Sequence, residues 1–452
     1  MADTAEQTTE RDIPQVKGHW FYGSLRDITK APQNFFAKAG PKGEGLFQFN
    51  IFHKKMVSVV DADCAAHIFK TNSQNYVRGP QFKKLQAILG SGLICLEGEL
   101  WKMHRKFVAS AFKPDFLKYS LSQNIELIHS LLGKWTEHEQ NDEPVELVDQ
   151  MRRFTLSVIV RGLFSTDIDL EKNQQLYQSI VDANDLIFRK NVSLISFPSW
   201  IPTPLNLKIA HARKEIDKFS LDQMSIKQSN PDRDSNDIVD YFLASNLDGE
   251  FSLNELLDEI RTLFVAGFET TATSLTWALY LLARNPDVAE RWIQELDEVL
   301  GERDPAWEDI ARLKYTENVI RESLRLYPPA YNLSRISLRD DVNQGYKVPA
   351  GSAENVSVYG IQRSDKYWKN PEQFQPERFE GDWPQHAYLP FGMGKHSCIG
   401  SRFSNIESIL ILASIGQRFT FSMLDSEEVL PNAQVTLLPG RKILVKLKSR
   451  AE

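Results

Sequence analysis

The sequence has few of the features that mark several large classes of protein. It contains three cysteines, Cys64, Cys95 and Cys398, which are too few for a disulfide framework or a four-cysteine metal site. Lys and Arg total 53 against 60 Asp and Glu, so the chain lacks the basic excess that general nucleic-acid binding requires. The polar residues 1–15 contain no apolar core of a signal peptide or membrane anchor. We therefore expect a cytoplasmic protein with no membrane anchor and no nucleic-acid partner.

Long apolar runs are also scarce. The nearest approach to a membrane span, 263–283, contains Glu269 and several threonines. A carboxylate in the middle of a span is costly in lipid. The segment is therefore predicted to be a buried helix of a globular protein, in which a Thr-rich stretch with one charge could simply be packed.

What the sequence does contain is 42% hydrophobic and 25% charged residues, the balance of a globular protein with a large core. Period-two alternation in 47–51 and 54–61 predicts a β-hairpin. From 62 to about 298 the spacing of apolar residues is mainly helical. Ser252 and Glu255 have capping-box spacing and begin a long helix that ends before Pro286.

The remaining elements complete a helix-rich prediction. Further helices are expected at 288–300, 314–326 and 402–417, and the alternating tail 435–448 is expected to form a terminal hairpin. The fold class is mainly α with small β-sheets. We expect one domain over 16–450, preceded by a disordered or loosely ordered segment 1–15.

The strongest chemical signal is the segment FGMGKHSCIG, residues 391–400. Cys398 lies between Gly394 and Gly400 and just before a helix. Glycines allow tight turns and the approach of a flat ligand, while a helix N-terminus stabilises a thiolate. The cysteine could be a nucleophile with His396 as base, a small packed residue, or a metal ligand. No second Cys or His has zinc-type spacing, and a single thiolate is what an iron porphyrin requires.

This segment resembles the haem-binding loop of the cytochrome P450 family, whose pattern is F-x-x-G-x-(R/H)-x-C-x-G. All five constrained positions match, and further motifs occur in the order found in the family. They are W-x-x-x-R at Trp101 and Arg105, AGFETT at 266–271, E-x-x-R at Glu322 and Arg325, and PERF with Arg378.

The resemblance implies the cytochrome P450 fold, with a long central helix over a haem b whose iron is bound by Cys398. Glu269 and Thr270 would form the acid–alcohol pair that organises water beside bound dioxygen. Arg335 stands where the family often has a propionate-binding arginine, although a surface arginine is the alternative. The other residues expected at the haem are Trp101, Arg105, Ala266, Gly267, Phe391, Gly392, His396 and Gly400, where Gly267 would let the helix lie against the flat ring.

Two further groups of residues follow from the resemblance. Glu322, Arg325 and Arg378 would form a buried ion network that braces the cysteine loop. The substrate pocket would be lined by Phe82, Phe264, Phe268, Ala330 and Leu333.

The activity implied is haem-thiolate monooxygenation of an apolar small molecule with O2. Electrons would come from an external ferredoxin or flavodoxin with its reductase. Lysines in 101–118, together with Lys395 and Arg402, form a plausible dock for such an acidic protein, or an ordinary solvated surface. Two alternatives stay open, a peroxide-driven haem peroxygenase and a non-catalytic haem sensor or electron carrier.

Overall fold

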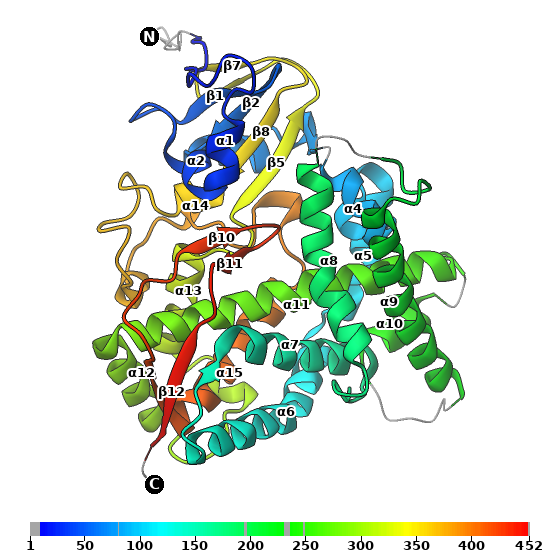
Figure 1. Cartoon of the computed structure of the whole chain (residues 1–452), viewed down its shortest axis with the longest axis vertical. Helices are drawn as coiled ribbons and strands as arrows, with labels where there is room; N and C mark the ends of the chain where they lie inside the picture. Colours follow the sequence, from blue (N-terminus) through cyan, green and yellow to red (C-terminus); the bar gives the residue numbers. More distant parts are fainter. Residues whose placement is uncertain (1–9, 80, 194–196, 230–235, 247–248, 451–452) are drawn as a thin grey trace, which may run out of the picture. The chain divides into compact units, whose positions relative to one another are not determined.

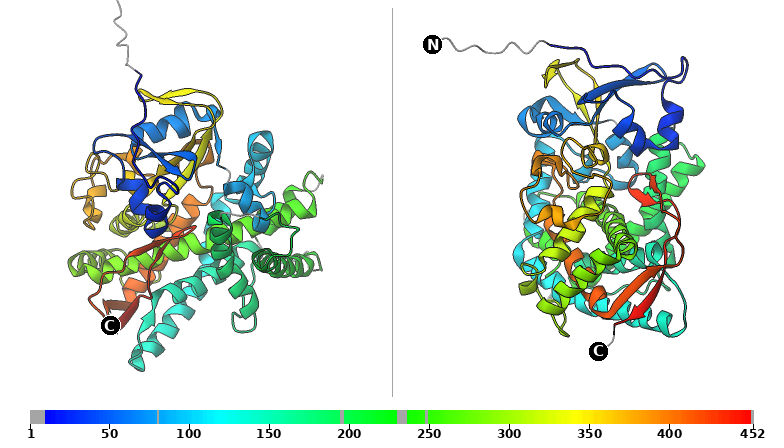
Figure 2. Two further views of the ribbon diagram at one scale, coloured as in Figure 1. Left: turned by 45° about the horizontal axis from the view of Figure 1, so that its top comes forward. Right: turned by 90° about the vertical axis from the view of Figure 1, so that its left-hand side faces the viewer.

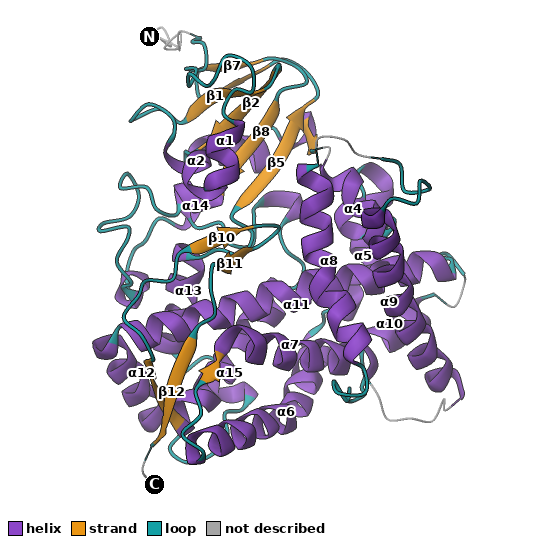
Figure 3. Cartoon of the chain, in the orientation of Figure 1, coloured by secondary structure: helices purple, strands orange, loops and turns teal. Residues whose placement is uncertain are grey.

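The structure is a computed structural model, and it describes residues 10–79, 81–193, 197–229, 236–246 and 249–450. Helices make up most of these residues, and the strands form small sheets (Figures 1 and 3). The predicted class, mainly α with small β-sheets, is confirmed. The chain divides into two compact units. We describe each unit separately.

Unit 1 comprises Met1–Gly79, Arg325–Gln373 and Asp382–Cys398. Its main feature is a five-stranded sheet in the order β1-β2-β8-β5-β3. The strands are β1 (Leu46–Ile51), β2 (Lys54–Val59), β3 (Tyr76–Arg78), β5 (Asn332–Ser337) and β8 (Ala353–Ser357), with a separate pair of β6 (Asp341–Asn343) and β7 (Tyr346–Val348). The helices are α1 (Leu25–Lys30), α2 (Pro32–Lys38), α3 (Ala62–Ala66), the π-helical η1 (His67–Thr71) and α14 (Val358–Ile361).

The predicted hairpin is present as β1 and β2, antiparallel and with Leu46 opposite Val59. Alternation buries Phe47 and Phe49, which meet Phe35 of α2 edge to face. Aromatic pairs in this arrangement add to the free energy gained by burial alone.

The segment 10–15 is more ordered than the sequence suggested. Arg11 N–H donates to the carbonyl of Gly345 at 2.8 Å, and the Arg11 guanidinium lies 4.1 Å from the ring centre of Tyr346. Residues 1–9 lie outside the described residues.

Unit 2 comprises Pro80–Leu324, Phe374–Gly381 and Ile399–Glu452. Its first helices are α4 (Gln81–Leu89), α5 (Gly98–Ala111), α6 (Pro114–Gln140), α7 (Leu147–Phe164), α8 (Gln174–Val192), α9 (Pro204–Ser229) and α10 (Ile238–Ser245). They are followed by α11 (Leu253–Arg284), α12 (Pro286–Val299), α13 (Lys314–Leu326) and α15 (Ser401–Arg418). The last two residues of α13 belong to unit 1. The predicted helix 314–326 has these bounds, and those expected at 288–300 and 402–417 correspond to α12 and α15.

The long helix α11 spans 32 residues. Figure 1 and the left view of Figure 2 show it as one continuous helix. Ser252 and Glu255 form the predicted capping box at its start. Most of its side chains are buried, because α11 contributes to a large core shared with α5, α6, α7 and α10. A helix that is apolar nearly all round belongs in the centre of a large unit.

The C-terminal tail corrects one prediction. The strands of 435–448, β11 (Leu437–Pro439) and β12 (Leu444–Ser449), do not pair with each other. Gly440 N–H donates to the carbonyl of Leu430 at 2.8 Å, which holds β11 against β10 (Pro431–Ala433). Strand β12 instead joins β9 (Phe419–Met423) and β4 (Val145–Glu146).

Candidate active site

The loop that carries Cys398 is shaped by its glycines. Gly392 and Gly394 have φ of 69° and 72°, a region that other residues rarely adopt. A Cβ at Gly394 would also collide with the backbone carbonyl of Phe69. The loop closes on itself where Cys398 N–H donates to the carbonyl of Phe391 at 2.9 Å. Cys398 itself is exposed, which removes the interpretation of a packed small residue.

Strand β5 lies near this loop in unit 1. A Cβ at Gly392 would be 3.6 Å from Cδ1 of Leu333, so the chain passes close to this side chain. Arg335, on the same strand, is only 6% exposed, and its guanidinium lies 4.9 Å from the ring centre of Phe69. The alternative of a surface arginine is therefore wrong for Arg335.

In unit 2, the acid of AGFETT has a partner that the motif does not reveal. Nη2 of Arg152, on α7, donates to Oε1 of Glu269 at 2.5 Å, and Glu269 is 1% exposed. Glu269 is therefore a buried carboxylate with an ion-pair partner. Arg152 is missed by sequence reasoning because 117 residues separate the two positions and no spacing rule relates them.

Burial raises the pKa of Glu269 above its ordinary value, and the charge of Arg152 opposes that shift. Only one carboxylate oxygen is bonded. Oε2 has no hydrogen-bond partner among the described residues. The group is therefore able to accept a proton on Oε2 while Arg152 holds Oε1.

The alcohol of the pair bonds backwards along the helix, as the motif suggested. Thr270 Oγ1 donates to the carbonyl of Ala266 at 2.6 Å. Ala266 is exposed and Thr270 is partly exposed, although most of α11 is buried. The side of α11 that carries Ala266 and Thr270 is thus accessible to solvent, while the rest of the helix around it is packed.

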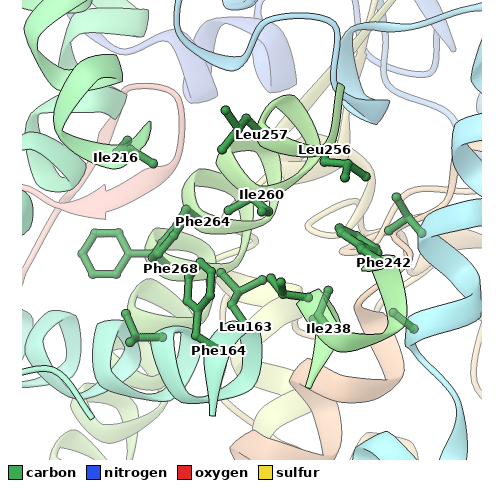
Figure 4. Packing of buried hydrophobic residues seen from close by; sticks show 14 of the residues in the cluster. Leu163, Phe164, Ile216, Ile238, Phe242, Leu256, Leu257, Ile260, Phe264 and Phe268 are labelled. Carbon is green, nitrogen blue, oxygen red and sulfur yellow. The ribbon is translucent and has the colours of Figure 1, made fainter. Parts of the chain in front are cut away.

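The opposite side of this part of α11 is closed by α7. Phe264 and Phe268 are fully buried and share one core cluster with Leu163 and Phe164 (Figure 4). The ring centres of Phe164 and Phe264 are 6.0 Å apart. This packing accounts for both side chains without a ligand, in place of the pocket-lining role expected for them.

Gly267 also faces α7. A Cβ at this position would lie 2.7 Å from Cδ1 of Ile159. The missing side chain therefore permits the close approach of α7 and α11. From the sequence we expected that position 267 is a glycine because the helix lies against a flat ring. The structure gives the contact with Ile159 as the reason instead.

The W-x-x-x-R motif lies on α5. Trp101 is buried and Arg105 is half-buried. Between them, His104 is buried and its Nδ1 lies 2.6 Å from Oε1 of Glu259 on α11. This pair fixes α5 on α11 and was not expected, because neither residue belongs to a constrained motif position.

One pair of the predicted ion network lies in unit 2, between Glu322 of α13 and Arg378 of the PERF segment. Nε of Arg378 lies 2.8 Å from Oε1 of Glu322, which also accepts from the backbone N–H of Gln375 at 3.0 Å. Glu322 is fully buried. In unit 1, Arg325 donates to the carbonyls of Gln362 and Pro371, both at 2.7 Å.

Comparison with known proteins places these features in a family. A family model described as Cytochrome P450 matches residues 13–447. The chain is 30% identical over 406 residues to "Protein LUTEIN DEFICIENT 5, chloroplastic" of Arabidopsis thaliana, a match covering 84% of this chain and 67% of that protein. It is 30% identical over 355 residues to "Cyclooctat-9-en-7-ol 5-monooxygenase" of Streptomyces melanosporofaciens, covering 77% and 76%. It is 28% identical over 432 residues to "Putative cytochrome P450 132" of Mycobacterium tuberculosis, covering 89% and 90%.

The chain belongs to the cytochrome P450 family. It is therefore an oxidoreductase, a monooxygenase with haem as its cofactor, and it needs O2 and a redox partner. Among the described residues, no helix is long and apolar enough to cross a membrane.

The residues of this P450 fit a haem. The described part of the chain has no group of three or more His, Cys, Asp or Glu side chains that could hold a metal ion, so a lone thiolate is the available donor. Cys398 is exposed, and a Cβ at Gly400 would meet nothing within 4 Å. In unit 2, Ala266 is open in the middle of α11.

The part of unit 2 that contains Phe82 has a second hydrophobic cluster. Phe82 and Ile94 pack against buried residues that include Leu89 of α4 and Val265 of α11. Val265 directly precedes the open Ala266, and sequence reasoning did not select it. One signal in the sequence could have identified Val265. It is an apolar residue of the long helix directly before the small residues of the AGFETT motif.

Proposed function

We propose that this P450 inserts one oxygen atom from O2 into an apolar small molecule, with Cys398 as the proximal ligand. The observation that carries the proposal is the loop geometry. Positive-φ glycines shape the segment, the Cys398 N–H bonds to Phe391, and the thiol is left exposed. The bound haem would supply the oxygen-activating chemistry, and the thiolate would contribute electron density to it.

Glu269 and Thr270, in unit 2, would bind and deliver protons. Thr270 Oγ1 bonds to the carbonyl of Ala266, which holds the hydroxyl beside the open stretch of α11. Burial raises the pKa of Glu269, and its Oε2 has no hydrogen-bond partner among the described residues, so the carboxyl can accept and return a proton there. An O2-dependent reaction requires such delivery, and a peroxide-driven reaction does not.

Arg335, Trp101, Arg105 and His396 would hold the haem carboxylates. Arg335 supports this role because it is nearly buried and an arginine suits bidentate binding of a carboxylate. Phe391, Gly392, Gly400 and Ala266 would lie around the ring, as the family motifs suggest.

For the substrate, we propose an apolar compound. Val265, Phe82 and Ile94 form an apolar group beside the open part of α11. In unit 1, Leu333 and Ala330 are partly exposed, apolar side chains. Fatty acids, terpenoids, polyketides and lipopeptides all meet this requirement, and one similar protein is named for oxidising cyclooctat-9-en-7-ol.

For the electron donor, we propose an acidic ferredoxin or flavodoxin with its reductase, in the cytoplasm. Lys102, Lys106, Lys113 and Lys118 are exposed along α5 and the start of α6, and Arg402 is exposed on α15. In a chain with a net charge of −7, a local cluster of cations favours an acidic partner.

The proposal is tested by the spectrum of the reduced, CO-bound protein. The wild type should show the band position typical of thiolate-ligated haem, and Cys398→His should abolish it. Cys95→Ser is the matched control, because Cys95 is a cysteine outside the loop, and it should leave the band unchanged. A band that survives Cys398→His would overturn the assignment of the ligand.

A further inference from the structure

Glu354 is buried in the sheet of unit 1 with no partner. It lies on β8 between β2 and β5 and is 0% exposed. Neither Oε1 nor Oε2 has a hydrogen-bond partner among the described residues. Burying an ionised carboxylate without a partner is costly, so such a group binds a proton instead. In agreement, burial raises the pKa of Glu354 to about 8, and the charge of Asp341 adds to that shift.

The neighbour of Glu354 across the sheet is an arginine. Glu354 pairs in register with Arg335 on β5 and with Val57 on β2. Residues directly opposite each other on adjacent strands point to the same face, with Cβ atoms roughly 5 Å apart. An arginine can easily reach a carboxylate across that distance.

The two groups nevertheless do not bond to each other. The Arg335 guanidinium lies over the ring of Phe69, and its Nη1 donates to the carbonyl of Ser334 at 2.8 Å. A neutral Glu354 explains this arrangement, because without a charge it exerts little attraction on the guanidinium. The same arginine is the proposed ligand of a haem carboxylate.

Other titratable side chains, on the elements packed around Glu354, also face it. Asp341 of β6 accepts from Tyr76 Oη at 2.6 Å and is 2.8 Å from Nε2 of His67, so its carboxylate already has hydrogen-bond partners. These neighbours are His67 of η1, Cys64 of α3, Tyr76 and Arg78 of β3, Arg335 of β5 and Asp341 of β6. Neither Asp341 nor the protonated forms of Tyr76 and Cys64 would neutralise an ionised Glu354, and His67 already bonds to Asp341. Arg335, directly opposite, is therefore the natural partner of an ionised Glu354.

We propose that Glu354 is a positioning residue for Arg335, controlled by one proton. Neutral Glu354 leaves the guanidinium to the haem carboxylate, and ionised Glu354 takes the guanidinium for itself. The proton is released to solvent when the ion pair forms. This inference rests on the proposed role of Arg335, and it predicts that haem is held less tightly as the pH rises past the titration of Glu354.

The experiment measures haem release from the holoprotein to excess apomyoglobin between pH 6 and pH 9.5, a range that brackets the pKa of Glu354 at about 8. In the wild type the release rate should rise about tenfold over this range, the order of one charge-assisted hydrogen bond. In Glu354→Gln, which keeps the shape and cannot ionise, the rate should stay constant. Glu372→Gln, an exposed glutamate of the same unit, is the matched control and should keep the wild-type pH dependence.

Arg335→Gln separates the proposed contact of Arg335 with the haem from the proposed role of Glu354. Faster haem release at all pH values, without pH dependence, supports both proposals. If Arg335→Gln does not change the rate at any pH, the proposed contact of Arg335 with the haem is wrong. If Arg335→Gln accelerates release but Glu354→Gln retains the pH dependence, the role of Glu354 alone is overturned.

Infrared spectroscopy measures the protonation of Glu354 directly, without measuring haem release. The infrared difference between the wild type and Glu354→Gln should show the carbonyl stretch of a protonated carboxylic acid that disappears between pH 7 and pH 9. The band of Glu407 occurs in both proteins and cancels in this difference. If the wild type and Glu354→Gln have identical carboxylic-acid bands at pH 7, Glu354 is already ionised and the proposal fails.

Discussion

Nη2 of Arg152 lies 2.5 Å from Oε1 of Glu269, and this contact joins α7 to the middle of α11. The carboxylate is almost completely buried, whereas the arginine side chain is 21% exposed. The arginine therefore keeps part of its hydration while the carboxylate depends on it for compensation. The acid of the AGFETT motif is thus held by a residue from another helix.

Replacing Arg152 with Gln should destabilise the protein, because Glu269 loses its partner. Breaking a buried ion pair typically costs ~3–5 kcal/mol, and protonation of Glu269 should reduce that loss. Burial already raises the pKa of Glu269, so the deficit should be smaller at pH 5 than at pH 7.5, because a larger share of the carboxyl is protonated there. Urea unfolding at both pH values measures this.

Arg153→Gln is the control for this prediction. Arg153 is the next residue on α7, and it forms a half-exposed pair with Asp149 at 2.6 Å. Exposed pairs contribute little to stability. Equal losses in the two variants, or a deficit for Arg152→Gln that is the same at both pH values, would contradict the pairing.

Thr270→Ala should misdirect electrons while leaving substrate binding intact. Without the hydroxyl, protons are delivered poorly, and peroxide or superoxide should be released in place of product. We expect the ratio of product formed to reductant consumed to fall by about tenfold, which lies below the usual range for loss of a positioned proton-transfer group. The substrate-induced spectral shift should remain. The ratio is measured with a surrogate ferredoxin and its reductase.

Thr276→Ala is the matched control for Thr270→Ala. Thr276 lies on the same helix and makes the same backward bond, from Oγ1 to the carbonyl of Ala272 at 2.7 Å, but it is buried. It should leave the ratio unchanged. An unchanged ratio in Thr270→Ala would remove Thr270 from the mechanism, and turnover with peroxide and no electron donor would favour the peroxygenase.

Arg325→Ala should reduce the yield of haem-loaded protein rather than turnover alone. Arg325 is fully buried, and its guanidinium satisfies the carbonyls of Gln362, Pro371 and Gln373. Removing the donor leaves buried acceptors unpaired, at about 1–3 kcal/mol for each group. The haem-to-protein ratio and the Tm are the measurements. Arg321→Ala, one turn earlier and partly exposed, should change both far less.

Glu407 predicts a pH dependence of stability. It is fully buried, Asn124 Nδ2 donates to its Oε1 at 3.0 Å, and burial raises its pKa to about 8. The folded state therefore keeps a proton that the unfolded state releases above its ordinary pKa. Stability should fall between about pH 4.5 and 8, by up to ~1.4 kcal/mol per pH unit.

Glu407→Gln isolates this effect because it keeps the acceptor and cannot titrate. The Tm of the wild type relative to Glu407→Gln should fall from pH 5 to pH 8. Replacement of the exposed Glu298 with Gln should produce no such trend. A wild-type curve parallel to that of Glu407→Gln would show that Glu407 is ionised in the fold.

The sequence by itself determined the features that depend on short-range chemistry. Alternation set the β1–β2 hairpin, Ser252 and Glu255 set the start of α11, and Pro286 set its end. The glycines around Cys398 likewise specify their loop, because φ preferences act on single residues. Motif order was enough to indicate the family.

Only the tertiary structure decided which side chains meet across the fold. Arg152 and Glu269 are separated by 117 residues and His104 and Glu259 by 155. The two strands of the tail pair with different partners, and Gly267 faces Ile159. Glu354 is an ordinary glutamate in the sequence and becomes an unpartnered buried acid only in the sheet. Such contacts depend on how helices and strands pack, and local spacing carries no information about that packing.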